Sequence, residues 1–353
     1  MNAAIWRQLF ALRPATHQWP GALQAATAIT VPPLLGLLVG EPRWGSVASI
    51  GALIVLHLPD RSRRERAVAL PLIAAALLVA ASIGALLGTA LIPGLIAMSV
   101  IAIGGSFLAQ ALSVGPPGAL FLVLITGSAG QLVAPIAKGG AGMSYLEVIA
   151  SLAGGALVGY LVVVLPLVVP SIRASDHEIF ERRTHWRFAV SASVRVVVAR
   201  IAVAAVLAVP VSAFLGLHHA AWVMLACLGI LQKDADVHSA ALHGVQRLIG
   251  TGVAIILVVV LAVIEPQGFA RIAWAAGLIF AFELLIRRNL TWALAAVTPM
   301  AVLLASAAGQ SIGEVADERV VDTLAGAAIA ALVLIGAVVV ERRRSTAGST
   351  HVG

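Results

Sequence analysis

Charged residues are scarce in this sequence. They make up 11% of its 353 residues, whereas an ordinary soluble domain carries about 25%. Hydrophobic residues make up 60%, and the mean hydropathy is +1.01. Because so few polar side chains could not cover the surface of a soluble fold, a soluble globular protein is excluded, and the expected solvent is the lipid bilayer.

Cysteine is nearly absent as well, and the single one, Cys227, lies within an apolar segment. No disulfide can form within the chain, and we expect a small buried side chain at this position. The sequence also lacks metal-ligand spacings, paired carboxylates, a Ser/His/Asp arrangement and a phosphate-binding loop. These absences predict no metal, no cofactor and no catalytic residue, so we do not expect an enzyme.

Long apolar runs are the main feature that is present. A bilayer-spanning helix needs about 20 mostly apolar residues. Twelve candidate segments predict an all-α integral membrane protein of about twelve transmembrane helices without a soluble domain. They are 22–40, 44–58, 67–92, 95–112, 118–136, 148–169, 190–215, 221–231, 248–264, 272–286, 292–308 and 320–340.

The basic residues predict the orientation. Twelve spans place seventeen Lys and Arg residues on the side that holds both termini and four on the other, where Arg43, Lys138, Arg271 and Arg319 lie. Because cytoplasmic loops are enriched in Lys and Arg, both termini are predicted to be cytoplasmic, in a cell (inner) membrane. The high pI of about 10.9 follows from these scattered loop charges, so it does not indicate nucleic acid.

The chain also carries an internal repeat. An offset of 178 residues places Trp44 on Trp222, and an offset of 172 places Gly154 on Gly326. An offset of 179 places Gln131 on Gln310, which we expect to be polar residues at helix contacts. Two parallel six-helix repeats follow, because an even number of spans keeps the orientation of each half.

The expected organisation has five parts. They are an interfacial N-terminal segment (1–21), a first six-helix repeat (22–170), a cytoplasmic linker (171–189), a second repeat (190–341) and a basic cytoplasmic tail (342–353). The glycine pairs Gly36/Gly40, Gly84/Gly88 and Gly155/Gly159 have the spacing of closely packed membrane helices.

Three stretches carry a family resemblance. They are 222–226 with 233–236, the R-x-x-G-T helix start at 247–251, and 318–326; the arginine-rich loop after Asp60 adds to them. The chain resembles the fusaric-acid-resistance-like (FUSC) membrane domain. This resemblance implies a relation to exporters of aromatic acids and drugs and to organic-anion channels. Those exporters usually have a large soluble domain between the halves, where this chain has only its linker.

Candidate substrate-path residues start with the second span of each half. These spans are short, with about 15 and 11 apolar residues, and paired short segments indicate a transporter's central site. A tilted hairpin without a ligand is the alternative. Trp44 and Trp222 begin these spans, either as interfacial anchors or as stacking surfaces for an aromatic ligand.

Basic residues supply the candidates for holding an anion. Lys233, Asp234, His238 and Arg247 are expected at the cytoplasmic mouth of the second half, where a guanidinium can hold a carboxylate with two hydrogen bonds. Ordinary positive-inside topology is the alternative. Arg200 is expected well inside the membrane, where a charge is costly and indicates function. The alternative is a side chain that extends back to the cytoplasmic surface.

Arg319 and Asp322 are the candidates at the other side. Their i,i+3 spacing predicts a local ion pair, and Asp322 is also a candidate proton-coupling carboxylate. Loop histidines, His219 among them, are expected to be solvated.

The residues together predict a transporter that exports a small, aromatic or organic anion between the two repeats. The alternatives are a passive organic-anion channel of the same fold and a non-transporting membrane scaffold. The expected partners are this anion and the lipid bilayer, without nucleic acid. Further possible partners are other copies of this chain and another protein of the cell envelope.

Overall fold

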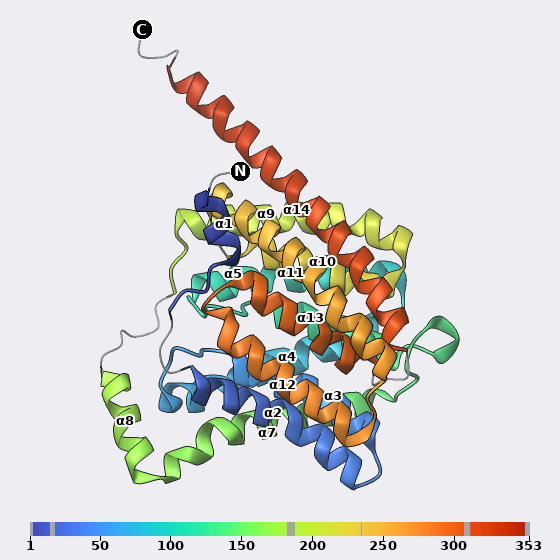
Figure 1. The fold of residues 1–353 in the computed structure, drawn as a ribbon. Coiled ribbons are helices and arrows are strands. Elements are labelled where there is room, and N and C mark those ends of the chain that lie inside the picture. Colours follow the sequence, from blue (N-terminus) through green and yellow to red (C-terminus); the bar gives the residue numbers. More distant parts are fainter. Residues whose placement is uncertain (1–2, 15–17, 182–187, 234, 307–310, 350–353) are drawn as a thin grey trace.

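The computed structural model describes residues 3–14, 18–181, 188–233, 235–306 and 311–349. Within these ranges every regular element is a helix, and the helices form one bundle (Figure 1). The α-helices are α1 (Ala3–Phe10), α2 (Trp19–Leu38), α3 (Pro42–Ala52), α4 (Arg63–Leu87), α5 (Leu91–Ala111), α6 (Leu120–Val133), α7 (Tyr145–Val164), α8 (Pro170–Glu181), α9 (Ala192–Leu215), α10 (Leu217–Leu231), α11 (Val237–Ile264), α12 (Gly268–Ile286), α13 (Leu290–Ser306) and α14 (Ile312–Ser349). Three 3-10 helices are η1 (Leu53–Leu56), η2 (Ile136–Lys138) and η3 (Leu165–Val168).

Eight helices are long and apolar enough to cross a membrane: α2, α4, α5, α7, α9, α11, α12 and α14. Four further apolar helices are shorter, namely Pro42–Leu56, Leu120–Val133, His219–Leu231 and Leu290–Ser306. Each of the twelve apolar segments predicted from the sequence coincides with one of these helices. The chain is therefore an all-helical, multi-pass membrane protein.

Short helices occur twice in each half. The second segment of each half is short as predicted, with 11 residues in α3 and 15 in α10. The fifth segments are also short, with 14 residues in α6 and 17 in α13. The apolar run 292–308 predicts the length of α13, whereas the run 118–136 is longer than α6. Pro117 and Pro135 flank α6, and a proline interrupts helical hydrogen bonding. The apolar run 118–136 therefore contains a helix shorter than itself.

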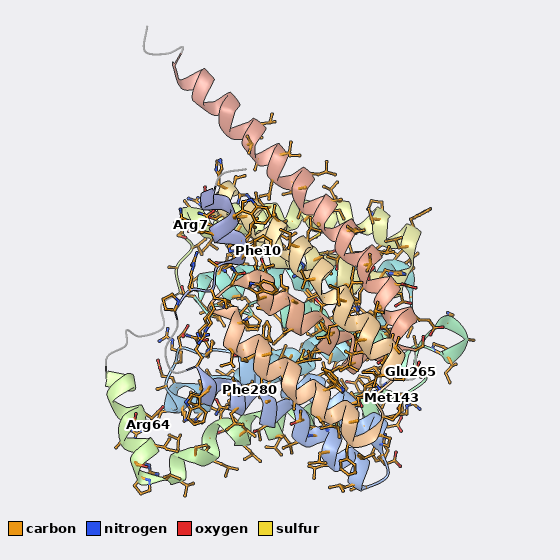
Figure 2. The ribbon with its side chains drawn as sticks, viewed as in Figure 1. Arg7, Phe10, Arg64, Met143, Glu265 and Phe280 are labelled. Carbon is orange, nitrogen blue, oxygen red and sulfur yellow. The ribbon has the colours of Figure 1, made fainter. Side chains whose placement is uncertain are left out.

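The two ends of the bundle carry different residues. Figure 2 shows Arg7, Phe10 and Arg64 at one end and Met143 and Glu265 at the other. We call these the basic end and the opposite end. Arg7 and Arg64, which the charge pattern assigns to the same side of the membrane, thus lie at the same end of the bundle.

The N-terminal helix α1 docks on the second half at the basic end. Gln246 Nε2 donates to the Gln8 carbonyl at 2.9 Å, and Trp292 Nε1 donates to the Phe10 carbonyl at 3.0 Å. The rings of Phe10 and Trp292 lie 6.3 Å apart. The last carbonyls of α1, which lack partners within the helix, are therefore bonded to the bundle.

The linker between the halves holds a helix, α8, that is fixed to the first half. The carboxylate of Asp176 accepts hydrogen bonds from the backbone N–H groups of Arg63 (2.6 Å) and Arg64 (3.2 Å). Asp176 is buried, and Ser62 completes the cap through a capping box with Glu65. A carboxylate at a helix N-terminus satisfies free donors and interacts favourably with the helix dipole.

We expect Asp176→Ala to lower the free energy of unfolding by about 1 kcal/mol, because two backbone donors at the start of α4 lose their acceptor. Asp176→Asn keeps one acceptor and should lose less. Thermal unfolding of the purified protein in detergent measures both. Equal unfolding temperatures for the parent and Asp176→Ala would contradict a capping role.

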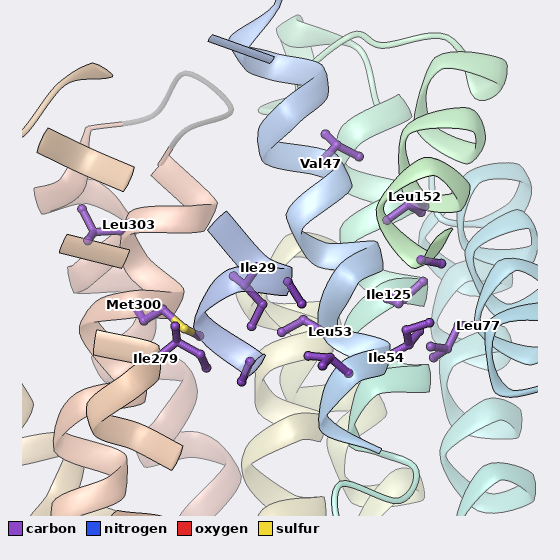
Figure 3. Packing of buried hydrophobic residues seen from close by; sticks show 14 of the residues in the cluster. Ile29, Val47, Leu53, Ile54, Leu77, Ile125, Leu152, Ile279, Met300 and Leu303 are labelled. Atoms are coloured by element: carbon purple, nitrogen blue, oxygen red, sulfur yellow. The ribbon is translucent and has the colours of Figure 1, made fainter. Parts of the chain in front are cut away.

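The core consists of two hydrophobic clusters, and each draws on both halves of the chain. In the first cluster, Ile29 and Leu53 lie with Ile279 and Met300 of α12 and α13 (Figure 3). In the second, α5 and α6 pack with α9, α10 and α14. The two halves therefore share their cores at the places where they meet.

Glycines set the closest helix crossings. A Cβ on Gly155 would overlap the backbone of Ala48, and one on Gly84 would overlap that of Thr126. The predicted glycine pairs thus do mark close packing, with one correction. Gly40 has open space around it and a φ of +81°, so it forms the turn after α2 rather than a helix contact.

Candidate functional site

The four short helices meet around a cavity of about 70 Å³. Its wall includes Arg43 of α3, Gln131 of α6, Trp222 of α10, Ala305 of α13, and Glu318 and Arg319 of α14. Met143, which lies at the opposite end in Figure 2, also lines it. The cavity therefore lies between the two halves of the chain, near one membrane face, and exceeds the roughly 10–15 Å³ that one water needs.

Arg319 is the buried charge of this cavity, with 8% of its surface exposed. Its guanidinium lies over the ring of Trp222, and its Nε and Nη1 have no hydrogen-bond partner among the described residues. The aromatic face attracts the cation, but a ring offers no acceptor for the N–H groups. A buried guanidinium with two free donors is a suitable partner for an anion.

Asp322 lies beside Arg319 on α14 and is 2% exposed. One of its carboxylate oxygens, Oδ1, lies 2.6 Å from Nδ1 of His219 on α10. The prediction that His219 is a solvated loop residue is therefore wrong, because it belongs to a helix and its side chain is 12% exposed. The spacing in the sequence could have indicated this contact, because His219 precedes Trp222 by three residues, as Arg319 precedes Asp322.

The two predicted tryptophans lie in different surroundings. Trp222 lines the cavity, whereas Trp44 is 44% exposed and is not part of the cavity wall. The Trp44 indole lies within hydrogen-bonding reach of Glu147, at the start of α7. Corresponding tryptophans thus contact a carboxylate in one half and a guanidinium in the other.

Arg247 belongs to α11 and contacts a different part of α10. Its guanidinium packs against Gly229, where a Cβ would come 2.5 Å from Nη1. Gly229 follows Trp222 by seven residues, which is about 10 Å along a helix. Arg200 of α9 is buried at 5% exposure. Neither of these arginines lines the cavity.

The other residues expected at the cytoplasmic mouth do not gather around Arg247. Lys233 and His238 are exposed, and Asp234 lies outside the described residues. Asp236 instead caps α11, and hydrogen bonds from the Ser239 backbone and side chain lower the pKa of its carboxyl group. This loop therefore starts a helix, and its exposed charges are separated from Arg247 by the first turns of α11.

Gln131 lines the cavity and also a second one of about 340 Å³, which lies between α4, α5 and α6. Gly139 and Gly140 are likewise shared by both walls. Gln310, its predicted counterpart, lies outside the described residues. Among the described residues no group of three His, Cys, Asp or Glu side chains could hold a metal ion.

The second half of the chain, which carries Trp222, Arg319 and Asp322, is similar in sequence to a known protein family. Residues 190–333 match the family model described as fusaric acid resistance protein-like. The second half of the chain is similar to this family. The fusaric-acid-resistance-like region includes Trp222, Arg247, Arg319 and Asp322, so the resemblance seen in these motifs is confirmed for that region.

One curated relative and the solved structures complete the comparison. The uncharacterized membrane protein YvaC of Bacillus subtilis (strain 168) is 28% identical over 120 residues, which are 34% of this chain and 19% of that protein. The chain thus spans about a fifth of the length of this relative. No solved structure matches the chain.

Proposed function

We propose that this protein is a membrane transporter that moves a small organic anion, with aromatic carboxylates as the preferred class, outward between its two halves. The observation that carries this proposal is the cavity where all four short helices meet, with the buried Arg319 in its wall. Short helices leave helix ends, and thus free backbone groups, within the depth of the membrane. Such groups are tolerated where they line a protein cavity and serve to bind a substrate.

The proposal includes twelve spans in two parallel repeats, and helix packing supports it. Helix α3 packs on α7 as α10 packs on α14. Helix α4 packs on α6 and α7 as α11 packs on α13 and α14. Between the halves, α5 packs on α9 as α12 packs on α2. Corresponding helices therefore have corresponding neighbours, which a duplication explains.

The packing contacts pair Gly326 with a residue of α7 that is one position later than the residue predicted from the sequence offset of 172. Gly155 packs against Ala48, and Gly326 packs against Ala226. Because Ala48 and Ala226 are 178 residues apart, like Trp44 and Trp222, these contacts relate Gly326 to Gly155. Gly154, which the sequence offset relates to Gly326, has open space around it.

The proposed orientation places the basic end in the cytoplasm. In a Cys227→Ser background, we expect Lys233→Cys to react with a membrane-impermeant maleimide only from the cytoplasmic side. Lys138→Cys should react only from the outside. Both lysines are exposed, so access through the protein does not limit the reaction. Labelling of both positions from the same side of intact cells would contradict the twelve-span arrangement.

Two buried arginines along α10 support an anionic substrate. Arg319 lies at Trp222, and Arg247 lies at Gly229, about 10 Å along the same helix. An unpaired carboxylate inside a low-dielectric region costs several kcal/mol, so an anion that crosses it needs positive partners on its way. These guanidinium groups are spaced so that an anion could pass from one to the next.

The test is flux from proteoliposomes that contain the full chain and are loaded with labelled benzoate. We expect saturable benzoate efflux and no acceleration for benzyl alcohol, which has the same ring without the charge. Benzoate flux equal to that of protein-free liposomes would contradict transport and favour the membrane scaffold. Flux that does not saturate and appears as a current would favour the alternative, a passive anion channel.

A further inference from the structure

The cluster formed by His219, Trp222, Arg319 and Asp322 carries an inference that rests on the proposed anion site. His219 and Trp222 are three residues apart on α10, and Arg319 and Asp322 are three residues apart on α14. Side chains with this spacing lie on the same face of a helix. The two faces meet, because Trp222 contacts Arg319 and His219 contacts Asp322.

We propose that His219 and Asp322 form a proton-binding site, and that proton binding there and anion binding at Arg319 strengthen each other. Nδ1 and Oδ1 lie 2.6 Å apart, a hydrogen-bonding distance, so the imidazole and the carboxylate are placed to hold a further proton as a pair. Both side chains are buried or nearly so, at 12% and 2% exposure. Water therefore screens their charge little, and each change of protonation alters the field at Arg319.

The reason for the coupling is the charge of the cluster. With Asp322 ionised and His219 neutral, the carboxylate offsets the guanidinium of Arg319, and an arriving anion finds little net positive charge. One proton raises the charge of the cluster by one, whether it resides on Nδ1 or on Oδ1. The anion then binds more tightly. By linkage, the bound anion raises the affinity of the pair for the proton by the same factor.

Other charged groups lie near the pair. Among the described residues, Glu318 and Arg319, both on α14, have fields that reach His219 and Asp322. The neighbouring helices α5, α6 and α13 contain no ionisable side chain. Those of α9 and α11, including Arg200 and Arg247, lie in the N-terminal halves of their helices, toward the basic end. Arg43 lines the cavity but donates to the Ala141 carbonyl.

A consequence follows for the transport cycle. The site would load a monocarboxylate together with one proton, so that the load carries no net charge. This separates the transporter from a passive anion channel of the same fold, because such a transporter would move benzoate in response to a proton gradient faster than the neutral acid crosses protein-free liposomes. Where the outside is the more acidic side, the proton gradient opposes export, so outward movement requires a larger outward gradient of the anion.

The experiment measures benzoate binding to the full-length purified protein by calorimetry between about pH 6 and pH 8.5, a range over which benzoate stays ionised and a histidine titrates. We expect the parent protein to bind benzoate at least about tenfold more tightly at the lower pH, which corresponds to about 1.4 kcal/mol. Asp322→Asn should bind equally well at both ends of the range, since His219 then lies near the positive charge of Arg319 without a carboxylate partner and should stay neutral throughout.

The matched control is Glu314→Gln, which removes a carboxylate from the same helix near its N-terminus. Glu314 is joined to Ser311 in a cap that glutamine can preserve. This variant should keep the pH dependence of the parent protein. An Asp322→Asn protein that is folded and still shows the tenfold change would overturn the proposal.

A second measurement needs only the parent protein and holds even if Asp322→Asn does not fold. Calorimetry in two buffers with different ionisation enthalpies gives the number of protons taken up with each benzoate. We expect uptake of up to one proton. Benzoate binding without proton uptake at every pH would overturn this inference and leave the anion site intact. An absence of benzoate binding at every pH would contradict the proposed function itself.

Discussion

Replacing Arg319 by glutamine is expected to lower benzoate flux by roughly a hundredfold. The substitution removes the buried guanidinium of the cavity and leaves a shorter, uncharged polar side chain. A hydrogen bond to a charged group contributes about 1.5–3 kcal/mol, and 2.7 kcal/mol corresponds to roughly a hundredfold. Arg319→Lys keeps the charge but loses the planar group that lies over Trp222, so we expect an intermediate flux.

The control for Arg319 is Arg271→Gln, which removes one positive charge near the same end of the bundle. Arg271 begins α12, donates to the Pro266 carbonyl at 3.1 Å and is not part of the cavity wall. Its loss should change benzoate flux less than about threefold, since screened surface charges contribute little. Initial rates per protein in proteoliposomes measure all three variants. If Arg319→Gln transports at the parental rate, Arg319 is a topology signal and the anionic substrate loses its main support.

The second large effect is expected at a helix crossing. Gly155→Ala should destabilise the protein by about 3 kcal/mol, because its new methyl group would overlap the backbone of Ala48 and force α3 and α7 apart. Gly154→Ala places the same methyl group one residue earlier on α7, where nothing lies within 4 Å. There alanine should be neutral or stabilising by up to about 1 kcal/mol, since it favours the helix over glycine.

Unfolding temperature in detergent and the amount of protein in the membrane measure this pair. The two changes are identical in chemistry and adjacent in sequence, so a difference between them can come only from packing. The opposite ranking, with Gly154→Ala the less stable, would mean that α7 presents a different face to α3. Equal stabilities would mean that the crossing can widen at no cost.

Much of the helix arrangement was predictable from local patterns. Apolar runs of membrane length identify candidate transmembrane helices, because insertion into a bilayer depends on the hydrophobicity summed over about 20 residues. The same averaging hid the shortness of α6, since apolar residues outside a helix count as much as those within it. The glycine spacings predicted close packing at Gly84 and Gly155 but not the turn at Gly40, which depends on its backbone conformation.

The candidate site was predictable only in part. Trp222, Arg319 and Asp322 were among the expected residues, and the structure brings them together. The expected partners Lys233 and His238 are exposed; Lys233 precedes α11 and His238 lies in its first turn, far along the helix from Arg247. Neighbours in sequence are poor guides here, because a helix turns successive side chains in different directions.

The sequence by itself determined the solvent, the class of fold and the residues with unusual chemistry. These properties follow from composition and from periodicity within single helices, and they need no knowledge of how the helices pack. The tertiary structure alone decided that His219 meets Asp322, that Trp222 lies under Arg319 while Trp44 is exposed, and that the four short helices enclose one cavity. Each of these depends on the rotation and crossing of helices that are far apart in the chain, by 103 residues for His219 and Asp322, and no local pattern fixes such an arrangement.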